Sequence, residues 1–319
     1  MSVDPAGKSP IELDAQYRAL REEAGWVERS CDFLEVTGPD ASEYLQSQLT
    51  NDVEAGNCIY AALLDRKAHV MADCRVLRLA DDRFLLASSP EAIAYLKKHL
   101  DTYRIGHDVS VSSADGLLMV SVLGPAARSL LDCPAAGSAD EFARVGLDAK
   151  EYLAAGTHDG IDLICSRDQL DGLRKSLDSR GIVEVEESAA EIVRIEAGEP
   201  RFGMELGPEV MPAEAGIVDR AVDFEKGCYL GQEPVARLHY KGRPNRLLRG
   251  LLLSRTARVG EELHFGERRV GLVTSCGISP AHGPIALSVL RREAEPGSTV
   301  TLGDDDASAS VVELPFHAR

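Results

Sequence analysis

Residues 226–233 place a thiol, an amine and two glycines close together, just ahead of Pro234. In an extended segment, Cys228 shares its face with Lys226, because alternate residues point the same way. Proline is favoured in the first turn of a helix, and a helix N-terminus adds positive potential. Both effects would lower the pKa of the Cys228 thiol, so this spacing predicts a reactive thiol. A buried, inert thiol beside a turn is the alternative.

The same eight residues, followed by Val235, Ala236 and Arg237, resemble the signature of the YgfZ-type folate-binding proteins. The resemblance covers about residues 30 to 315. It departs from the family pattern at Ala68, where a glycine usually follows lysine, and at Ser47, which also replaces a glycine. Further similar segments are residues 44–53, 63–67, 194–198 and 270–275.

YgfZ-type proteins are related to the aminomethyltransferase of the glycine cleavage system. The resemblance implies a tetrahydrofolate-binding accessory protein that supports assembly or repair of iron–sulfur enzymes, including tRNA-modifying ones, with Cys228 as reactive thiol. The implied ligand is tetrahydrofolate or a one-carbon derivative. Two alternatives stay open: an aminomethyltransferase that makes methylenetetrahydrofolate and ammonia from a lipoyl-bound aminomethyl group, and a non-catalytic folate-binding module. Whether the chain is an enzyme, as a folate-dependent one-carbon transferase, is therefore left open.

Glu196 stands in the last turn of an expected helix over residues 187–197, which ends at Gly198 as a natural C-cap. A carboxylate there opposes the helix dipole by about 0.3–1 kcal/mol at an exposed site, and an unfavourable placement is a hint of function. A solvated surface glutamate is the alternative. The resemblance of the Arg194-x-Glu-Ala-Gly run implies that Glu196 holds the pterin ring and that Arg194 belongs to the folate-binding set.

Three further folate-binding residues are implied by the resemblance, and they lie in and after the signature segment. They are Tyr229, Gln232 and Arg237. Tyr229 could stack on a pterin, or it could close a core, as an aromatic residue beside glycines often does.

Asp73 lies in an expected strand whose apolar residues alternate, so it points away from their face. A polar residue on the wet face of a sheet is the simple interpretation. The resemblance to the aminomethyltransferases instead implies that Asp73 lies near the reactive folate nitrogens, where it orients an amine or steers a proton. Asp73 then forms the catalytic set with Cys228 and Lys226.

Composition sets limits on the kind of protein. A chain of 319 residues with 44% apolar residues can fill about two or three domains. The N-terminus has no apolar signal segment and no window holds about 18 apolar residues, so we expect a cytoplasmic protein without a membrane span. Seven scattered cysteines without a Cys-x-x-Cys pair indicate reduced thiols. No metal-ligand spacing and no phosphate-binding glycine loop occurs, so no metal, nicotinamide, flavin or ATP site is expected.

Charge is unevenly distributed. The net charge of −17 opposes direct RNA binding, for which the basic run over residues 237–258 is the one candidate surface. That run is either a solvated face or an anion site suited to the glutamate tail of a folate. The expected partners are a reduced folate and iron–sulfur enzymes or cluster-assembly proteins. Between Pro234 and Gly260 there is no acidic residue, and the basic ones are Arg237, Lys241, Arg243, Arg246, Arg249, Arg255 and Arg258.

The elements that position these residues follow an α+β pattern. Helices are expected at residues 11–23, 90–103, 125–131, 167–179 and 187–197, with another ending at 49. Strands are expected at 33–36, 59–64, 70–79, 83–87, 109–111 and 117–123, followed by a strand-rich stretch over 150–165. Short runs separated by glycines after residue 245 predict a small β-barrel, at 247–253, 262–265, 268–274, 285–289, 299–302 and 308–314.

The expected domains are residues 1–30 as a tail with a short helix, 31–115 as a first α+β unit, 116–245 as a second and 246–319 as the barrel. The second unit carries the signature segment, and the two units can interleave. The resemblance implies that both units are ferredoxin-like, and that they form a ring with the barrel around a central folate channel.

Overall fold

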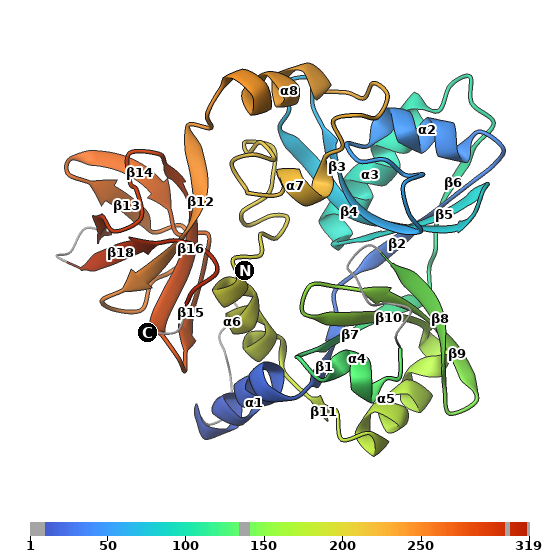
Figure 1. Cartoon of the computed structure of the whole chain (residues 1–319), viewed down its shortest axis with the longest axis horizontal. Helices are drawn as coiled ribbons and strands as arrows, with labels where there is room; N and C mark the ends of the chain where they lie inside the picture. Colours follow the sequence, from blue (N-terminus) through green and yellow to red (C-terminus); the bar gives the residue numbers. More distant parts are fainter. Residues whose placement is uncertain (1–9, 134–140, 304–306, 318–319) are drawn as a thin grey trace.

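The structure is a computed structural model that describes residues 10–133, 141–303 and 307–317. Its described strands form three sheets of five, six and seven strands, with helices packed between and around them (Figure 1). This confirms the predicted α+β class. None of the described helices combines the length and the apolar character needed to cross a membrane.

The five-stranded sheet is antiparallel throughout, in the order β3-β4-β5-β2-β6. Helix α3 (Pro90–Tyr103) covers it, and has the predicted bounds because Pro90 starts it and the Ser89 hydroxyl accepts from the Ala92 N–H at 3.3 Å. A shorter helix, α2 (Ala41–Gln48), follows β2. The strands are β2 (Asp32–Thr37), β3 (Cys58–Leu64), β4 (Val70–Ala80), β5 (Arg83–Ser88) and β6 (Ser110–Ser113).

The six-stranded sheet has the order β11-β1-β7-β10-β9-β8, so it joins a strand that precedes the five-stranded sheet in the chain to strands that follow it. Residues 25–29 were expected to belong to an N-terminal tail, but they form β1 (Gly25–Arg29) between β7 and β11. A five-residue strand that ends in Glu28 and Arg29 has too little periodicity to be recognised from sequence. The others are β7 (Leu117–Leu123), β8 (Phe142–Leu147), β9 (Lys150–Gly156), β10 (Gly160–Ser166) and β11 (Val183–Glu184). Helices α4 (Ala127–Leu130), η2 (Arg167–Gln169) and α5 (Leu170–Ser179) accompany this sheet.

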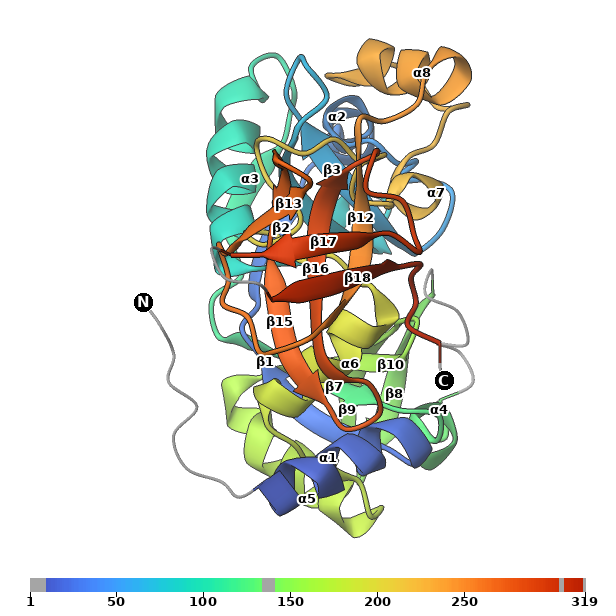
Figure 2. The same cartoon turned by 90° about the vertical axis from the view of Figure 1, so that its left-hand side faces the viewer.

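The seven-stranded sheet, in the order β14-β13-β17-β18-β12-β16-β15, curls around an apolar core (Figure 2). Leu251, Leu263 and Leu302 are fully buried there. Strand β15 was not expected as a separate strand. The strands are β12 (Arg246–Leu253), β13 (Glu262–Phe265), β14 (Arg268–Leu272), β15 (Ser275–Ser279), β16 (Gly283–Arg291), β17 (Thr299–Leu302) and β18 (Ser308–Val312).

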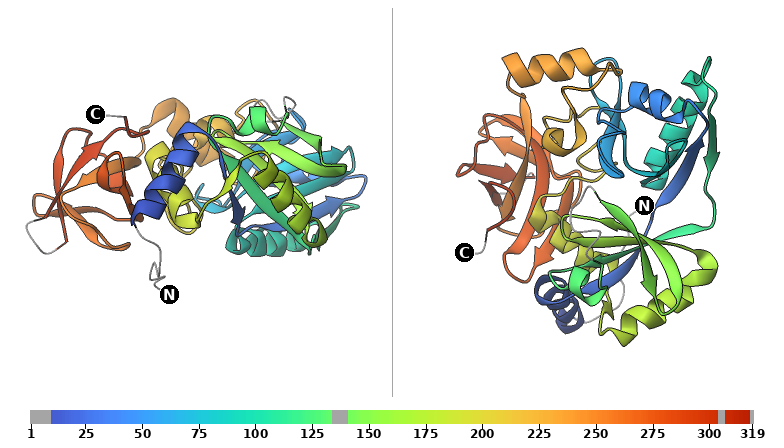
Figure 3. Two further views of the ribbon diagram at one scale, coloured as in Figure 1. Left: turned by 90° about the horizontal axis from the view of Figure 1, so that it is seen from below. Right: turned by 45° about the vertical axis from the view of Figure 1, so that its right-hand side comes forward.

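Helix α6 (Glu187–Ala197) connects the sheets. It packs on α1 (Pro10–Glu22), β15 and β16, and Figure 3 shows it between the six- and seven-stranded sheets. Gly198 ends it with φ 74°, the left-handed C-cap that the sequence predicts. Short α7 (Val218–Ala221) and then α8 (Gln232–Lys241) lead into β12. The ring arrangement and the ferredoxin-like character of the units stay predictions.

Candidate functional site

Asp73 lies on β4 and is held by two hydroxyl groups. The Tyr60 hydroxyl on β3 donates to Oδ2 at 2.7 Å, and the Ser88 hydroxyl donates to Oδ1 at 3.3 Å. Ala62 pairs directly opposite Asp73, so Tyr60 is its diagonal neighbour across the strands. Burial raises the pKa of Asp73, and the two hydrogen bonds oppose that rise. The wet-face interpretation is therefore wrong: this carboxylate is partly buried and oriented.

Arg220 of α7 extends this polar group towards a cavity. Its guanidinium lies 4.8 Å from the centre of the Tyr60 ring, and its Nη2 is 2.6 Å from Glu199 Oε2. The amide of Asn51 donates to the carbonyls of both Tyr60 and Arg220 at 2.9 Å, which fixes α7 against β3. The cavity has a volume of about 330 Å³, and its lining includes Glu199, Arg220, Arg249, Leu248 and Leu314.

The sequence motifs predict no role for Tyr60, Arg220 or Glu199. Tyr60 could have been found, because pairing the two predicted strands places it beside Asp73. Arg220 and Glu199 could not, since their positions depend on tertiary packing of segments without strong periodicity.

Lys226 contacts the end of α2. Its ammonium group donates to the carbonyls of Gln46, Leu49 and Asn51 at 2.8, 2.7 and 2.9 Å. It thereby uses all three N–H donors and satisfies carbonyls at and just beyond a helix C-terminus. Burial lowers the pKa of Lys226 to about 8. Activation of the Cys228 thiol by Lys226 stays a prediction. In the structure, the Lys226 ammonium group is hydrogen-bonded to backbone carbonyls.

The other predicted signature residues lie around the start of α8. That helix begins at Gln232, two residues before the expected start at Pro234. Gly231 precedes it with φ 85°, and a side chain there would meet the Asp65 carbonyl at 2.5 Å, so only glycine fits. Tyr229 is only 7% exposed and packs in an apolar core. This matches the alternative interpretation, in which Tyr229 closes a core. Arg237 is exposed on α8.

Glu196 is buried between α1 and β15, with 2% of its surface exposed, so the alternative of a solvated surface glutamate is wrong. The Tyr17 hydroxyl donates to its two carboxylate oxygens at 2.9 and 3.0 Å, and the Ser279 hydroxyl donates to Oε1 at 2.5 Å. Arg21 Nε lies 3.9 Å from Oε2. Burial, with the Glu196 charge, raises the pKa of Tyr17 to about 12. The pterin role of Glu196 stays a prediction.

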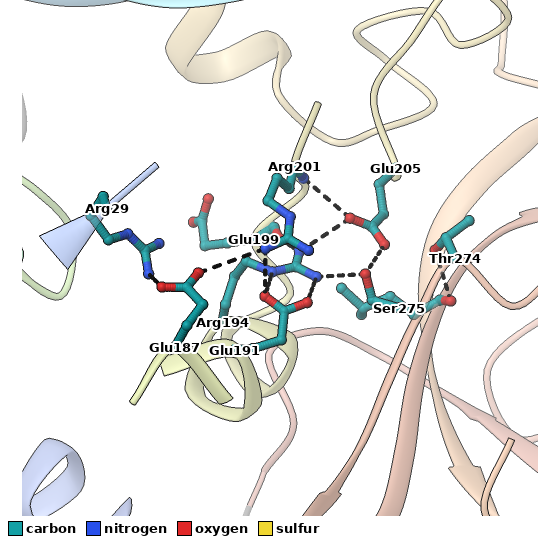
Figure 4. A network of polar contacts seen from close by, with 10 residues as sticks. Arg29, Glu187, Glu191, Arg194, Glu199, Arg201, Glu205, Thr274 and Ser275 are labelled. Carbon is teal, nitrogen blue, oxygen red and sulfur yellow. Dashed lines mark hydrogen bonds and ion pairs between the residues drawn. The ribbon is translucent and has the colours of Figure 1, made fainter. Parts of the chain in front are cut away.

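Arg194 is the centre of a polar network on α6 (Figure 4). Its five N–H donors serve both Glu191 oxygens at 2.8 Å, Glu205 at 3.1 Å, Ser275 at 2.6 Å and the Glu199 carbonyl. Glu205 has no exposed surface and also accepts from the Ser275 hydroxyl at 2.6 Å. These contacts join α6 to β15 and to the segment after α6. The predicted folate contact of Arg194 is untested, and its donors are occupied by protein groups.

Cys228 is exposed, whereas the other six cysteines are buried or partly buried. We therefore expect Cys228 to be alkylated at least ten-fold faster than any other cysteine in the native protein. Mass spectrometry of each cysteine after brief treatment with iodoacetamide measures this, with the unfolded protein as control. Equal rates at Cys228 and at Cys276 would contradict it.

In the described part of the chain, no cluster of three or more His, Cys, Asp or Glu side chains is placed to hold a metal.

Comparison with known proteins agrees with this architecture. Residues 11–153 match the model of the GCVT N-terminal domain. The chain is 27% identical to an aminomethyltransferase of Corynebacterium jeikeium over 98% of this chain and 92% of that protein. It is 29% identical to one of Halalkalibacterium halodurans over 96% and 90%. The crystal structure of glycine cleavage system aminomethyltransferase T from Bartonella henselae matches with a TM-score of 0.83 and 25% identity, covering 97% of this chain and 90% of that one.

These findings show that the chain is similar to proteins of the GcvT-like superfamily. They correct the main functional expectation, which was an accessory protein for iron–sulfur enzymes. Relatives that match this chain along nearly its whole length are named aminomethyltransferases, which favours the alternative interpretation. The expectation rested chiefly on residues 226–233, whereas the aminomethyltransferase matches cover nearly the whole chain. None of the relatives named here is described as a partner of iron–sulfur or tRNA-modifying enzymes.

Proposed function

We propose that the chain is a folate-dependent aminomethyltransferase, which transfers an aminomethyl group to tetrahydrofolate and releases ammonia. The relatives and the matching fold support this reaction class. The observation that carries the proposal is the Asp73 carboxylate, held by Tyr60 and Ser88 at the inner end of a polar group that extends through Arg220 to a cavity. The resemblance to the YgfZ-type signature groups the chain with those proteins by sequence only. We infer no activity from it.

The cavity residues suit a folate. Arg220 and Arg249 line it, and guanidinium groups pair well with the carboxylates of a glutamate tail. Glu199 is paired with Arg220, and the predicted pterin ligand, Glu196, lies outside this lining, buried between α1 and β15. Tetrahydrofolate supplies the amine nitrogens that receive the carbon unit. Asp73 orients a reacting amine and accepts its proton, since a carboxylate within hydrogen-bond reach acts as a general base. Tyr60 and Ser88 keep that carboxylate in one orientation.

Turnover of a small donor tests the proposal. The full chain is mixed with tetrahydrofolate and the aminomethyl adduct of reduced lipoamide, and ammonia and methylenetetrahydrofolate are measured together. Equal amounts of both products, formed only when the protein is present, are expected. Tetrahydrofolate binding by calorimetry without any turnover would refute the transferase assignment and leave a folate-binding module.

Glu196→Gln is expected to weaken tetrahydrofolate binding by about 10- to 100-fold from a micromolar dissociation constant, because a neutral amide loses a charged hydrogen bond to the pterin. Calorimetric titration measures the change. Tyr17→Phe is the matched variant: it keeps the carboxylate and removes the hydroxyl that covers it, so affinity should hold or increase. An affinity of Glu196→Gln equal to that of the native protein would remove Glu196 from the folate site.

A further inference from the structure

Six of the seven basic residues between Pro234 and Gly260 fall into two sets, and Arg258 lies apart from both, between β12 and β13. One set is neutralised within the chain, as Arg246 pairs with Glu214, Arg249 with Glu313 and Arg255 with Glu261. The other set is Arg237, Lys241 and Arg243, at α8 and the turn after it. These three side chains are exposed, and none makes an ion pair or hydrogen bond with another described residue. Acidic residues outnumber basic ones by 52 to 35, so unpaired cations gathered on one helix and the turn after it are unexpected. Together with Glu233 in the first turn of α8, they give the helix and the turn after it a net charge of +2 within a chain of net charge −17.

Aromatic and apolar groups accompany these cations. Tyr240 is 68% exposed, and His239 stacks on Phe224 with ring centres 4.1 Å apart. Val235 is the only buried residue of α8. A cavity of about 320 Å³ lies beside the helix, and its lining includes Met211, Val218, Val235, Leu238 and Pro244. Exposed tyrosine and arginine beside an apolar pocket are the groups enriched in protein interfaces.

Helix α8 also lies close to the candidate site. Figures 1 and 2 show it beside α7 and β3, which carry Arg220 and Tyr60. Lys226, just before α8, binds the Asn51 carbonyl, and the Asn51 side chain holds the Arg220 carbonyl. A partner on α8 would therefore lie next to the elements that hold the proposed reacting groups.

We propose that α8 and the turn at residues 242–244 form the docking surface for an acidic face of the protein that presents the aminomethyl donor. This inference rests on the proposed function, and adds the surface and the charge of the partner. Carboxylates of the partner meet Arg237, Lys241 and Arg243, while Tyr240 and the pocket take its apolar groups. A polynucleotide is disfavoured, because three cations release few counterions and the remaining surface repels phosphate.

The test compares the same aminomethyl group on two donors: an acidic lipoyl domain and free reduced lipoamide. In Lys241→Glu/Arg243→Glu, KM for the domain-borne donor should rise at least ten-fold, with kcat and the KM for the free donor unchanged. Added salt should raise KM for the domain in the native protein and have little effect in the variant. Arg237 is kept, because it is also a predicted folate-binding residue. Lys98→Glu/Lys175→Glu, on the exposed faces of α3 and α5, is the matched control and should behave as the native protein.

Equal KM values for the domain-borne donor in the variant and the native protein would overturn the docking surface. An equal rise in this KM in the control variant would overturn it as well. If the native protein turns over neither donor, the proposed function fails. Calorimetric binding of the acidic lipoyl domain, and its loss in Lys241→Glu/Arg243→Glu, then still decides the docking surface. Binding of a short RNA that is lost in the variant, with domain binding intact, would assign α8 to RNA instead.

Discussion

Asp73→Asn is expected to lower kcat for aminomethyl transfer by about 10²- to 10⁴-fold, the usual contribution of a positioned general base. Asparagine keeps the size of the side chain and an acceptor for the Tyr60 hydroxyl, so the fold and the binding of tetrahydrofolate should persist. Steady-state kinetics measures the loss, with calorimetry and circular dichroism as controls. A kcat within three-fold of the native value would take Asp73 out of the reaction.

The pH profile gives a second readout of the same group. The carboxylate is the active form and burial raises the pKa of Asp73, so kcat/KM should fall with decreasing pH at a higher pH than for an ordinary aspartate. Tyr60 donates to the ionised form and so opposes that rise. Tyr60→Phe should therefore move the acid limb to still higher pH while keeping activity on the plateau. If the acid limb does not move in Tyr60→Phe, the ionisation that causes it belongs to a group other than Asp73.

Arg194→Met is expected to lower the free energy of unfolding by about 3–5 kcal/mol, since it leaves the Glu205 carboxylate buried without its cation. Glu205 has no exposed surface and lies 3.1 Å from Arg194. Urea unfolding measures the change. Arg201→Met is the control, because that side chain is 39% exposed and its pair with Glu191 should contribute about 1 kcal/mol or less.

The double variant Arg194→Met/Glu205→Gln should recover part of the lost stability, because it removes the uncompensated charge. Equal losses in Arg194→Met and Arg201→Met would show that burial of Glu205 does not set the energy of this network.

The elements predicted well have strong local signals. Helix α3 starts at a serine and proline pair and α6 ends at Gly198, so their bounds follow from residues within the helices or beside them. Strand β1 lacked such a signal, because its stability comes from pairing with β7, almost a hundred residues later in the chain. The same distinction applies to the site. Asp73 and Glu196 were predicted through similar motifs, and Tyr60 follows from pairing two predicted strands. The partners Tyr17 and Arg220 instead depend on tertiary contacts that no short segment encodes.

The placement of β1 makes the five-stranded unit an insertion within the second. The chain leaves β1 at Arg29, builds β2 to β6 over residues 32–113, and returns at β7, where Met119 pairs with Arg29. The two connecting segments therefore emerge side by side from neighbouring strands. During synthesis, the five-stranded unit is complete before β7 is made. Strand β1 of the six-stranded sheet therefore stays unpaired until more than eighty further residues have been added. The order of synthesis thus favours independent folding of the five-stranded unit. The six-stranded sheet forms afterwards, when β7 pairs with β1.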